Sequence, residues 1–171
     1  MIFNLKRSPF KRRIVGHLEG FSQELLVDLP VLKYVSRYRQ VKSWSNEAGG
    51  QLFGTVDNDT VCVLEASGPY PGDERSRYRY RSNPVAAQYA IDKMAQRGLL
   101  YLGEWHTHAE DYPSASDLDN NAMRRLIENS RLNSNSLLLL IVGRVLCSDG
   151  LAVWSVANAK LHRWELQTLS K

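Results

Sequence analysis

The chain has 171 residues, with 22 Lys and Arg against 18 Asp and Glu, which gives a formal net charge of +4. A composition of 43% hydrophobic and 23% charged residues is typical of globular proteins, and it excludes disorder for most of the chain. The length predicts one domain with a sizeable core. The two cysteines, Cys62 and Cys147, exclude a disulfide scaffold and a cysteine-based zinc ribbon, and they fit a reducing compartment.

The first segment, residues 1–13 (MIFNLKRSPFKRR), is basic and lacks the apolar stretch of a signal peptide. The longest strongly apolar run, residues 137–142, is far shorter than the roughly 18 residues of a membrane-spanning helix. We therefore expect a cytoplasmic protein without membrane association, with a loosely ordered basic segment over residues 1–13 and one domain over residues 14–171.

The first half of this domain is predicted to contain short strands around one helix. Pro30 suits the first turn of a helix within residues 30–42, because its missing N–H is not needed there. The triplet 57–59 (Asp-Asn-Asp) is a turn signal between two strands. The strands expected here are residues 14–17, 24–27, 51–56 and 60–66.

In the second half, strands alternate with two longer helices. Pro84 starts a helix that runs to about residue 97, where Gly98 fits the position after its end. A second helix is expected over residues 116–131. Strands are expected at residues 99–105, 137–143, 151–156 and 160–166, the last two as a closing hairpin. This order predicts an α/β domain with a mixed β-sheet flanked by helices.

Side chains that can bind a metal or transfer a proton are concentrated in residues 103–119 (GEWHTHAEDYPSASDLD). His106 and His108 are two residues apart at the end of a predicted strand, so both imidazoles can face the same side. Two neutral imidazoles and a nearby carboxylate make a zinc-type site. Taken alone, the pair also fits two ordinary polar residues at a strand end.

A carboxylate for such a site is available on the following helix. Asp119 would lie in the first turn, three residues after Ser116, and the same spacing forms a capping box. Spacing alone also leaves Glu110, Asp111 and Asp117 as alternative third ligands. Glu104 shares a strand face with the histidines and is an alternative general base.

The pattern H-x-H, seven residues, S-x-x-D resembles the JAMM motif of the JAB/MPN metalloprotease family. The family also has an upstream glutamate, which Glu47 supplies in EAGGQLFG, and the element order over residues 14–166 is similar to an MPN domain. The resemblance implies an α/β MPN-like domain that binds zinc through His106, His108 and Asp119. It makes Glu47 the general base and Ser116 a hydrogen-bond donor to the oxyanion. Family members commonly have proline after the second histidine, where this chain has Ala109, a change that removes no ligand.

The EAGG and GEWHTH stretches resemble JAMM deconjugases of ubiquitin-like systems, including those of cyclic-nucleotide anti-phage (CBASS) operons. This resemblance implies a zinc-dependent isopeptidase that cleaves after the flexible C-terminal tail of a ubiquitin-like or conjugated protein. An E1–E2-like enzyme and a cyclase would act in the same pathway. The alternatives are a non-enzymatic MPN scaffold, which the complete set of site residues disfavours, and a nucleic-acid-associated MPN-like protein. A third is a small-peptide or amide hydrolase that releases a sulfur-carrier protein or a small product.

Arginine and tyrosine alternate in the segment 75–81 (RSRYRYR). As one extended strand it would place its arginines on one face, solvated at a sheet edge. By the resemblance this segment borders the active-site groove, so Arg77, Tyr78 and Arg79 are candidate substrate-binding residues. Nucleic-acid binding through phosphates and stacked bases is the less favoured interpretation.

Overall fold

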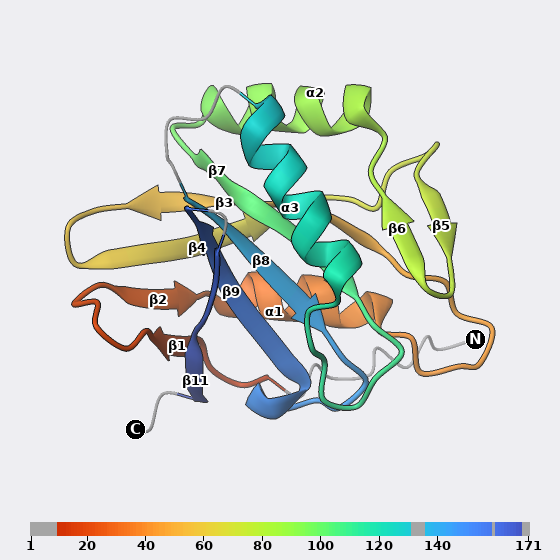
Figure 1. Cartoon of the computed structure of the whole chain (residues 1–171), viewed down its shortest axis with the longest axis horizontal. Helices are drawn as coiled ribbons and strands as arrows, with labels where there is room; N and C mark the ends of the chain where they lie inside the picture. Colours follow the sequence, from red (N-terminus) through yellow and green to blue (C-terminus); the bar gives the residue numbers. More distant parts are fainter. Residues whose placement is uncertain (1–9, 131–135, 159, 169–171) are drawn as a thin grey trace, which may run out of the picture.

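The computed structural model describes residues 10–130, 136–158 and 160–168. Figure 1 shows a curved sheet with helices on both faces. Its strands are β1 (Ile14–His17), β2 (Glu24–Val27), β3 (Gly49–Val56), β4 (Thr60–Ala66), β7 (Leu100–Thr107), β8 (Ser136–Val142), β9 (Leu151–Ala157), β10 (Lys160–Arg163) and β11 (Glu165–Thr168). The helices are α1 (Leu29–Val35), α2 (Pro84–Ala95) and α3 (Asp117–Asn129), with short 3₁₀ turns η1 (Ser36–Tyr38) and η2 (Ser148–Gly150).

The nine strands form one mixed sheet in the order β10-β9-β8-β7-β3-β4-β2-β1-β11. The pairs β7–β8 and β2–β4 are parallel and the others antiparallel. This confirms the predicted α/β fold with a mixed sheet flanked by helices. The consecutive strands β10 and β11 stand at opposite ends of the sheet order, so the sheet curls round on itself.

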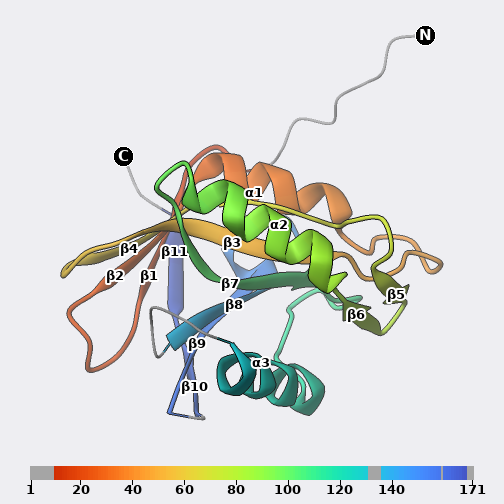
Figure 2. The same ribbon diagram turned by 90° about the horizontal axis from the view of Figure 1, so that it is seen from above.

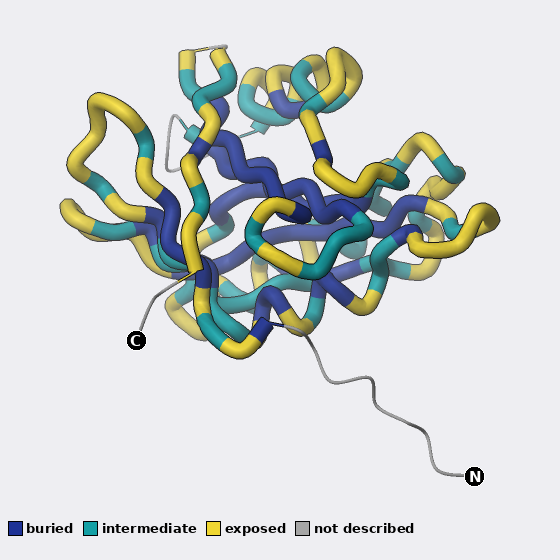
Figure 3. The backbone as a smooth tube through the Cα atoms, turned by 90° about the horizontal axis from the view of Figure 1, so that it is seen from below, coloured by how far each residue is buried: buried dark blue, intermediate teal, exposed yellow. Residues whose placement is uncertain are grey.

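The core lies on both sides of β8. Leu138, Leu140 and Val142 join the cluster that includes the buried face of α1. The alternate residues of β8 pack with Met123 of α3 and with Trp154 of β9. Figure 2 shows α1 and α3 on opposite sides of the central strands, and Figure 3 shows burial concentrated along those strands. A strand buried on both faces explains the unbroken apolar run that the sequence shows here.

Three predicted elements differ from those observed. The helix expected within residues 30–42 ends at Val35 and continues only as η1, because Arg39 adopts an extended conformation. The last predicted strand, 160–166, is interrupted at Trp164, which is buried with its indole N–H bonded to the Ser155 hydroxyl at 2.8 Å. β10 therefore pairs with β9, whereas β11 pairs with β1.

The Arg/Tyr segment forms a two-stranded hairpin of β5 (Glu74–Ser76) and β6 (Arg79–Arg81), not one extended strand. The chain reverses at Arg77 and Tyr78, so Arg75 is paired with Tyr80, and Ser76 with Arg79. The expectation that the arginines share one face is therefore wrong, because a turn interrupts the alternation on which it was based.

At the chain start, residues 1–9 of the expected basic segment lie outside the described residues, while Phe10 is buried in the core. Within the described ranges, no helix is both long and apolar enough to cross a membrane.

Candidate active site

Three side chains converge at the carboxyl end of β7. The Nε2 atoms of His106 and His108 lie 3.0 Å apart, and Asp119 Oδ1 lies 3.1 Å from His106 Nε2. Asp119 Oδ2 is 3.5 Å from His108 Nε2. In the part of the chain that the structure describes, these three residues are the cluster of His, Cys, Asp or Glu side chains that could hold a metal ion.

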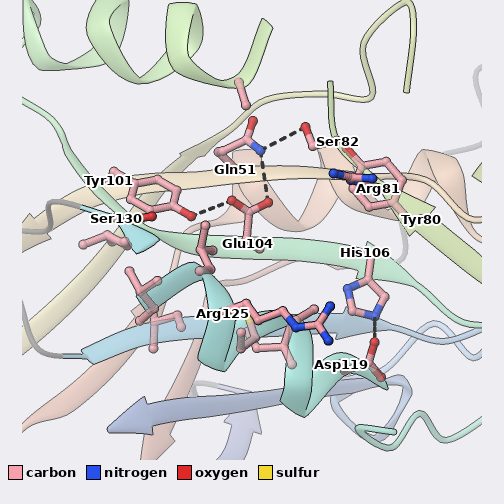
Figure 4. Close-up of a pocket in the computed structure, with 18 of the residues that line it drawn as sticks. Gln51, Tyr80, Arg81, Ser82, Tyr101, Glu104, His106, Asp119, Arg125 and Ser130 are labelled. Carbon is pink, nitrogen blue, oxygen red and sulfur yellow. Dashed lines mark hydrogen bonds and ion pairs between the residues drawn. The ribbon is translucent and has the colours of Figure 1, made fainter. Parts of the chain in front are cut away.

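Regular elements hold each of the three. His106 lies within β7, between β3 and β8, and His108 directly follows the strand with its N–H bonded to Val142 O at 3.0 Å. Asp119 is on the first turn of α3. Figure 4 shows His106 and Asp119 pointing toward each other across the gap between β7 and α3.

Ser116 fixes the Asp119 carboxylate through a capping box. Asp119 Oδ2 accepts hydrogen bonds from the Ser116 N–H at 2.7 Å and from its hydroxyl at 2.6 Å, and Ser116 Oγ accepts from the Asp119 N–H at 3.2 Å. The Ser116 hydroxyl proton is therefore directed at Asp119. As an oxyanion donor, Ser116 would have to redirect this proton toward the substrate.

The site favours positive charge. Burial disfavours ionisation of Asp119, but hydrogen bonds from both histidines and Ser116 hold the pKa of its carboxyl well below its usual range. Burial likewise opposes protonation of His108, yet Asp119, with the charges of Glu47 and Glu110, raises the pKa of that imidazole. Such an arrangement of acceptors around two imidazoles suits a bound cation.

Glu47 lies immediately before β3 and is largely buried, at 7% exposure. Burial raises the pKa of its carboxyl to about 7; the His108 charge opposes this rise, while Asp119 and Glu110 add to it. The structure thus brings Glu47 into electrostatic range of the cluster, although it is distant in sequence. A carboxyl with a pKa near neutrality can both accept and return a proton.

The three carboxylates considered as alternative third ligands lie outside the cluster of His106, His108 and Asp119. Glu110 lies behind His108, with its Oε2 3.6 Å from His108 Nδ1. Asp111 pairs with Arg144 Nε at 2.9 Å. Asp117 is exposed at the start of α3 and is not part of the cluster.

Glu104 lies in the groove on the same face of β7 as His106. Its carboxylate accepts hydrogen bonds from the Tyr101 hydroxyl and, at 3.0 Å, from Gln51 Nε2 (Figure 4). Burial raises the pKa of Glu104 to about 7, against the effect of these two hydrogen bonds. Both of its oxygens are thus occupied by neighbours, which favours a structural role for Glu104 over that of the alternative general base.

A groove leads to the cluster between α2 and α3, with Tyr101, Glu104 and His106 of β7 along its floor. Ala87 and Ile91 of α2 line one wall, and α3 lines the other (Figure 4). Its α3 residues include Leu118, Ala122 and Arg125. An open groove of this kind admits an extended chain rather than a compact ligand.

The three hairpin candidates occupy different positions. Arg77 donates from its guanidinium to Lys42 O (3.2 Å) and Ser43 O, so it fastens the hairpin to the preceding loop. Tyr78, 74% exposed, and Arg79 line the groove and are free to meet a substrate. Because Arg75 and Arg77 both bind main-chain carbonyls of the protein itself, fewer arginines of this segment are free to meet phosphates.

Gly49 and Gly50 allow the backbone to approach its neighbours closely. A Cβ on Gly50 would lie 1.8 Å from Ser67 O, and one on Gly49 would lie 2.5 Å from both Trp105 O and the Tyr80 ring. Gly49 therefore allows β3 to approach β7 and the hairpin close to Glu47, and Gly50 allows it to approach Ser67 after β4.

Two further buried polar residues, Gln40 and Thr107, lie near the site. Gln40 is 1% exposed and donates from Nε2 to Arg77 O at 2.8 Å and to Ser45 O at 3.1 Å. Thr107, the residue between the histidines, accepts from the Ala48 N–H through Oγ1 at 3.0 Å. The stretch around Gln40 is polar and basic (SRYRQVKS), so no signal in the sequence marks this glutamine as buried.

Comparison with known proteins gives a consistent family assignment. Residues 35–166 match the family model of prokaryotic homologues of the JAB domain. A curated protein from Vibrio cholerae named CD-NTase/cGAS isopeptidase is 39% identical over 110 residues, which cover 63% of this chain and 68% of that protein. Another of that name from Escherichia coli is 28% identical over 130 residues, covering 74% and 81%.

Among solved structures, protein DSY2949 from Desulfitobacterium hafniense aligns with a TM-score of 0.58 and 20% identity, covering 80% of this chain and 87% of that one. This similarity shows the fold alone.

The chain belongs to the JAB/MPN family, among its prokaryotic homologues. This confirms the family resemblance read from the motif and its deconjugase subgroup, to which the named isopeptidases correspond. Membership and the names of the relatives support a hydrolase of the isopeptidase class.

Proposed function

We propose that this protein is a zinc-dependent isopeptidase that cleaves after the C-terminal tail of a conjugated protein. The observation that carries the proposal is the convergence of His106, His108 and Asp119, with Glu47 in electrostatic range, at the end of an open groove. A cytoplasmic location, expected from the sequence, is part of the same proposal.

The donor atoms fit zinc. With bonds of about 2.0–2.1 Å, two ligands of a tetrahedral zinc lie about 3.3 Å apart. The atom pairs here lie 3.0, 3.1 and 3.5 Å apart. Two imidazole nitrogens that face each other share at most one proton, so a cation accepting both lone pairs removes their repulsion. When bound, zinc supplies a Lewis acid and a water molecule whose pKa is about 7.

Glu47 and Ser116 supply proton transfer and stabilisation of the oxyanion. Glu47 takes a proton onto its carboxylate and returns it to the leaving amine, a role that suits a carboxyl with a pKa of about 7. Ser116 orients Asp119 in the free protein, and its hydroxyl donates to the developing oxyanion in the reaction.

The relatives' names suggest the substrate. Those proteins are named CD-NTase/cGAS isopeptidase, so we propose a cyclase joined through its C-terminal tail to a target. The joining step would belong to an E1–E2-like enzyme of the same pathway. Arg79 and Tyr78 would contact the extended tail, because such a segment can lie along an exposed strand.

The test uses the full chain and a cyclase fused at its C-terminus to a reporter, with the cut mapped by mass spectrometry. We expect one cut immediately after the cyclase tail, and we expect a chelator to block it. Cuts throughout unfolded proteins, without preference for the tail, would overturn the deconjugase proposal. Cleavage that is unaffected by removal of the metal would overturn the zinc mechanism.

A further inference from the structure

The position of Glu47 depends on its main chain. In the described part of the chain, no hydrogen bond holds the Glu47 carboxylate, which the surrounding charges affect only at longer range. The backbone at residues 47 and 48 therefore fixes the point and the Cα–Cβ direction from which the carboxylate reaches the cluster. General acid–base chemistry requires this carboxylate to be held within hydrogen-bond reach of the reacting atoms.

One side of this backbone is fixed to the strand of the metal ligands. The Ala48 N–H donates to Thr107 Oγ1 at 3.0 Å, and the Thr107 N–H donates to Ala48 O at 2.8 Å. Both bonds are buried, and both are made by Thr107, the residue between His106 and His108. They fix Ala48 and the N–H side of the planar Glu47–Ala48 peptide, but they leave its carbonyl side and the Glu47 N–H to other contacts.

The other side is fixed by β5 of the hairpin. The Glu47 N–H donates to Ser76 O at 2.8 Å. The Glu47 carbonyl accepts a hydrogen bond from Arg75 Nε at 2.5 Å. A guanidinium is always charged and makes stronger hydrogen bonds to a carbonyl than a neutral donor does.

The hairpin is itself a firm support for Arg75. Arg77 binds Lys42 O and Ser43 O, and Gln40 binds Arg77 O. At its base, Asp73 accepts from the Asn83 N–H at 2.7 Å and from the Tyr80 hydroxyl at 3.1 Å. The loop before Glu47 and the hairpin therefore form one hydrogen-bonded unit.

We propose that Arg75 is a positioning residue: it holds the main chain of Glu47 so that the carboxylate stays directed at the cluster of His106, His108 and Asp119. The inference rests on the proposed function. It assigns to Arg75 a contact with Glu47 and none with the substrate, in contrast to Arg79 on the opposite face of the hairpin.

The kinetic test compares three variants of the full chain. Arg75→Met keeps the length of the side chain and removes the donor, and a displacement on the scale of 1 Å costs about 100-fold in rate. We expect kcat to fall between about 10-fold and 100-fold, with KM within about threefold and zinc content unchanged. Arg75→Lys retains one charged donor and should recover part of kcat. Arg97→Met, which removes an arginine paired with Glu65 away from the groove, is the matched control and should leave kcat unchanged.

The second readout is independent of activity. Amide hydrogen exchange in residues 42–48, measured by mass spectrometry, should be faster in Arg75→Met than in the wild type and unchanged in Arg97→Met. An unchanged kcat, or a loss confined to KM, would overturn the positioning role. So would unchanged exchange, or loss of zinc together with faster exchange across the whole sheet. If the wild type cleaves no conjugate, the proposed function fails, and the exchange measurement alone decides whether Arg75 holds Glu47.

Discussion

At the scale of single residues, the site combines three ligand atoms with one adjacent carboxyl group. The Nε2 atoms of His106 and His108 face each other, and each faces one oxygen of the Asp119 carboxylate, Oδ1 for His106 and Oδ2 for His108, at distances close to one tetrahedral ligand spacing. All three side chains are largely buried. Buried lone pairs that face one another are costly unless a proton or a metal cation lies between them.

Metal content tests this arrangement. We expect about one zinc per chain in the purified protein, because three protein ligands and one open position complete a single site. The double variant His106→Ala, His108→Ala should lose most of this zinc, as measured by elemental analysis after gel filtration. Asp117→Ala is the matched control and should retain it, because Asp117 is exposed and is not part of the cluster. Full zinc content in the double variant would show that the metal site is elsewhere.

The base is tested separately from the ligands. Glu47→Gln should keep its zinc and its circular dichroism spectrum but lose about two to four decades in kcat, because an amide cannot transfer the proton. Glu104→Gln is the control: its carboxyl is bound by Tyr101 and Gln51, so the variant should remain active. The opposite result, an inactive Glu104→Gln and an active Glu47→Gln, would mean that the base is misassigned.

At the scale of elements, the N-terminus of α3 serves both the fold and the metal site. Ser116→Ala removes both hydrogen bonds made by the hydroxyl, and loss of such a cap costs about 1 kcal/mol of stability. Release of the Asp119 carboxylate should also weaken zinc binding by about 10-fold to 100-fold. Thermal unfolding and zinc titration measure the two effects.

Ser116→Thr is the matched control for this experiment, because threonine retains the hydroxyl and can cap the helix. Its stability and zinc affinity should be close to those of the wild type. If Ser116→Ala binds zinc normally and loses only kcat, the serine acts on the substrate alone and does not orient Asp119.

The turn between β3 and β4 gives a pH-dependent prediction. Hydrogen bonds from the N–H of Asp59, and from the hydroxyl and N–H of Thr60, hold the pKa of Asp57 below its ordinary value of 3.8. A lowered folded-state pKa gives stability that is fully present above the unfolded value and is lost as pH falls through the folded value. Asp57→Asn should therefore be less stable than the wild type at about pH 6, with the gap closing toward about pH 3.

Urea unfolding of both proteins at the two pH values measures this gap. A gap that is the same at both would show that the charge of Asp57 contributes nothing, and that its contribution is only geometric.

At the scale of the whole molecule, β8 joins two cores in one cooperative unit. Leu139 packs on the α3 side and Leu140 on the α1 side, each about 1% exposed. Truncation of either to alanine should cost about 2–5 kcal/mol, because each leaves a cavity in a packed layer. We expect a single unfolding transition in both variants by circular dichroism and by tryptophan fluorescence. Two separate transitions would mean that the layers fold independently and would contradict a single domain.

The sequence by itself determined the local chemistry. His106 and His108 share a face because a strand alternates its side chains, and Ser116 and Asp119 form a capping box because one helical turn separates them. Most strands and the helices α2 and α3 were also predictable, since turn residues and apolar periodicity mark them. These features depend on covalent spacing over a few residues, which the sequence states directly.

Only the tertiary structure decided which distant groups meet. The family resemblance had named Glu47 and Asp119, but residue spacing alone could not. In the structure, the pairing of Gly49 with His106 across β3 and β7 brings Glu47 toward the cluster, and Asp119 rather than Asp117 lies in it. The Arg/Tyr segment also forms a hairpin in which Arg75 binds the Glu47 carbonyl. The alternation of arginine and tyrosine in the sequence does not predict this contact. The physical reason is that such contacts depend on how a curled sheet and its helices pack together, and packing is a property of the whole chain.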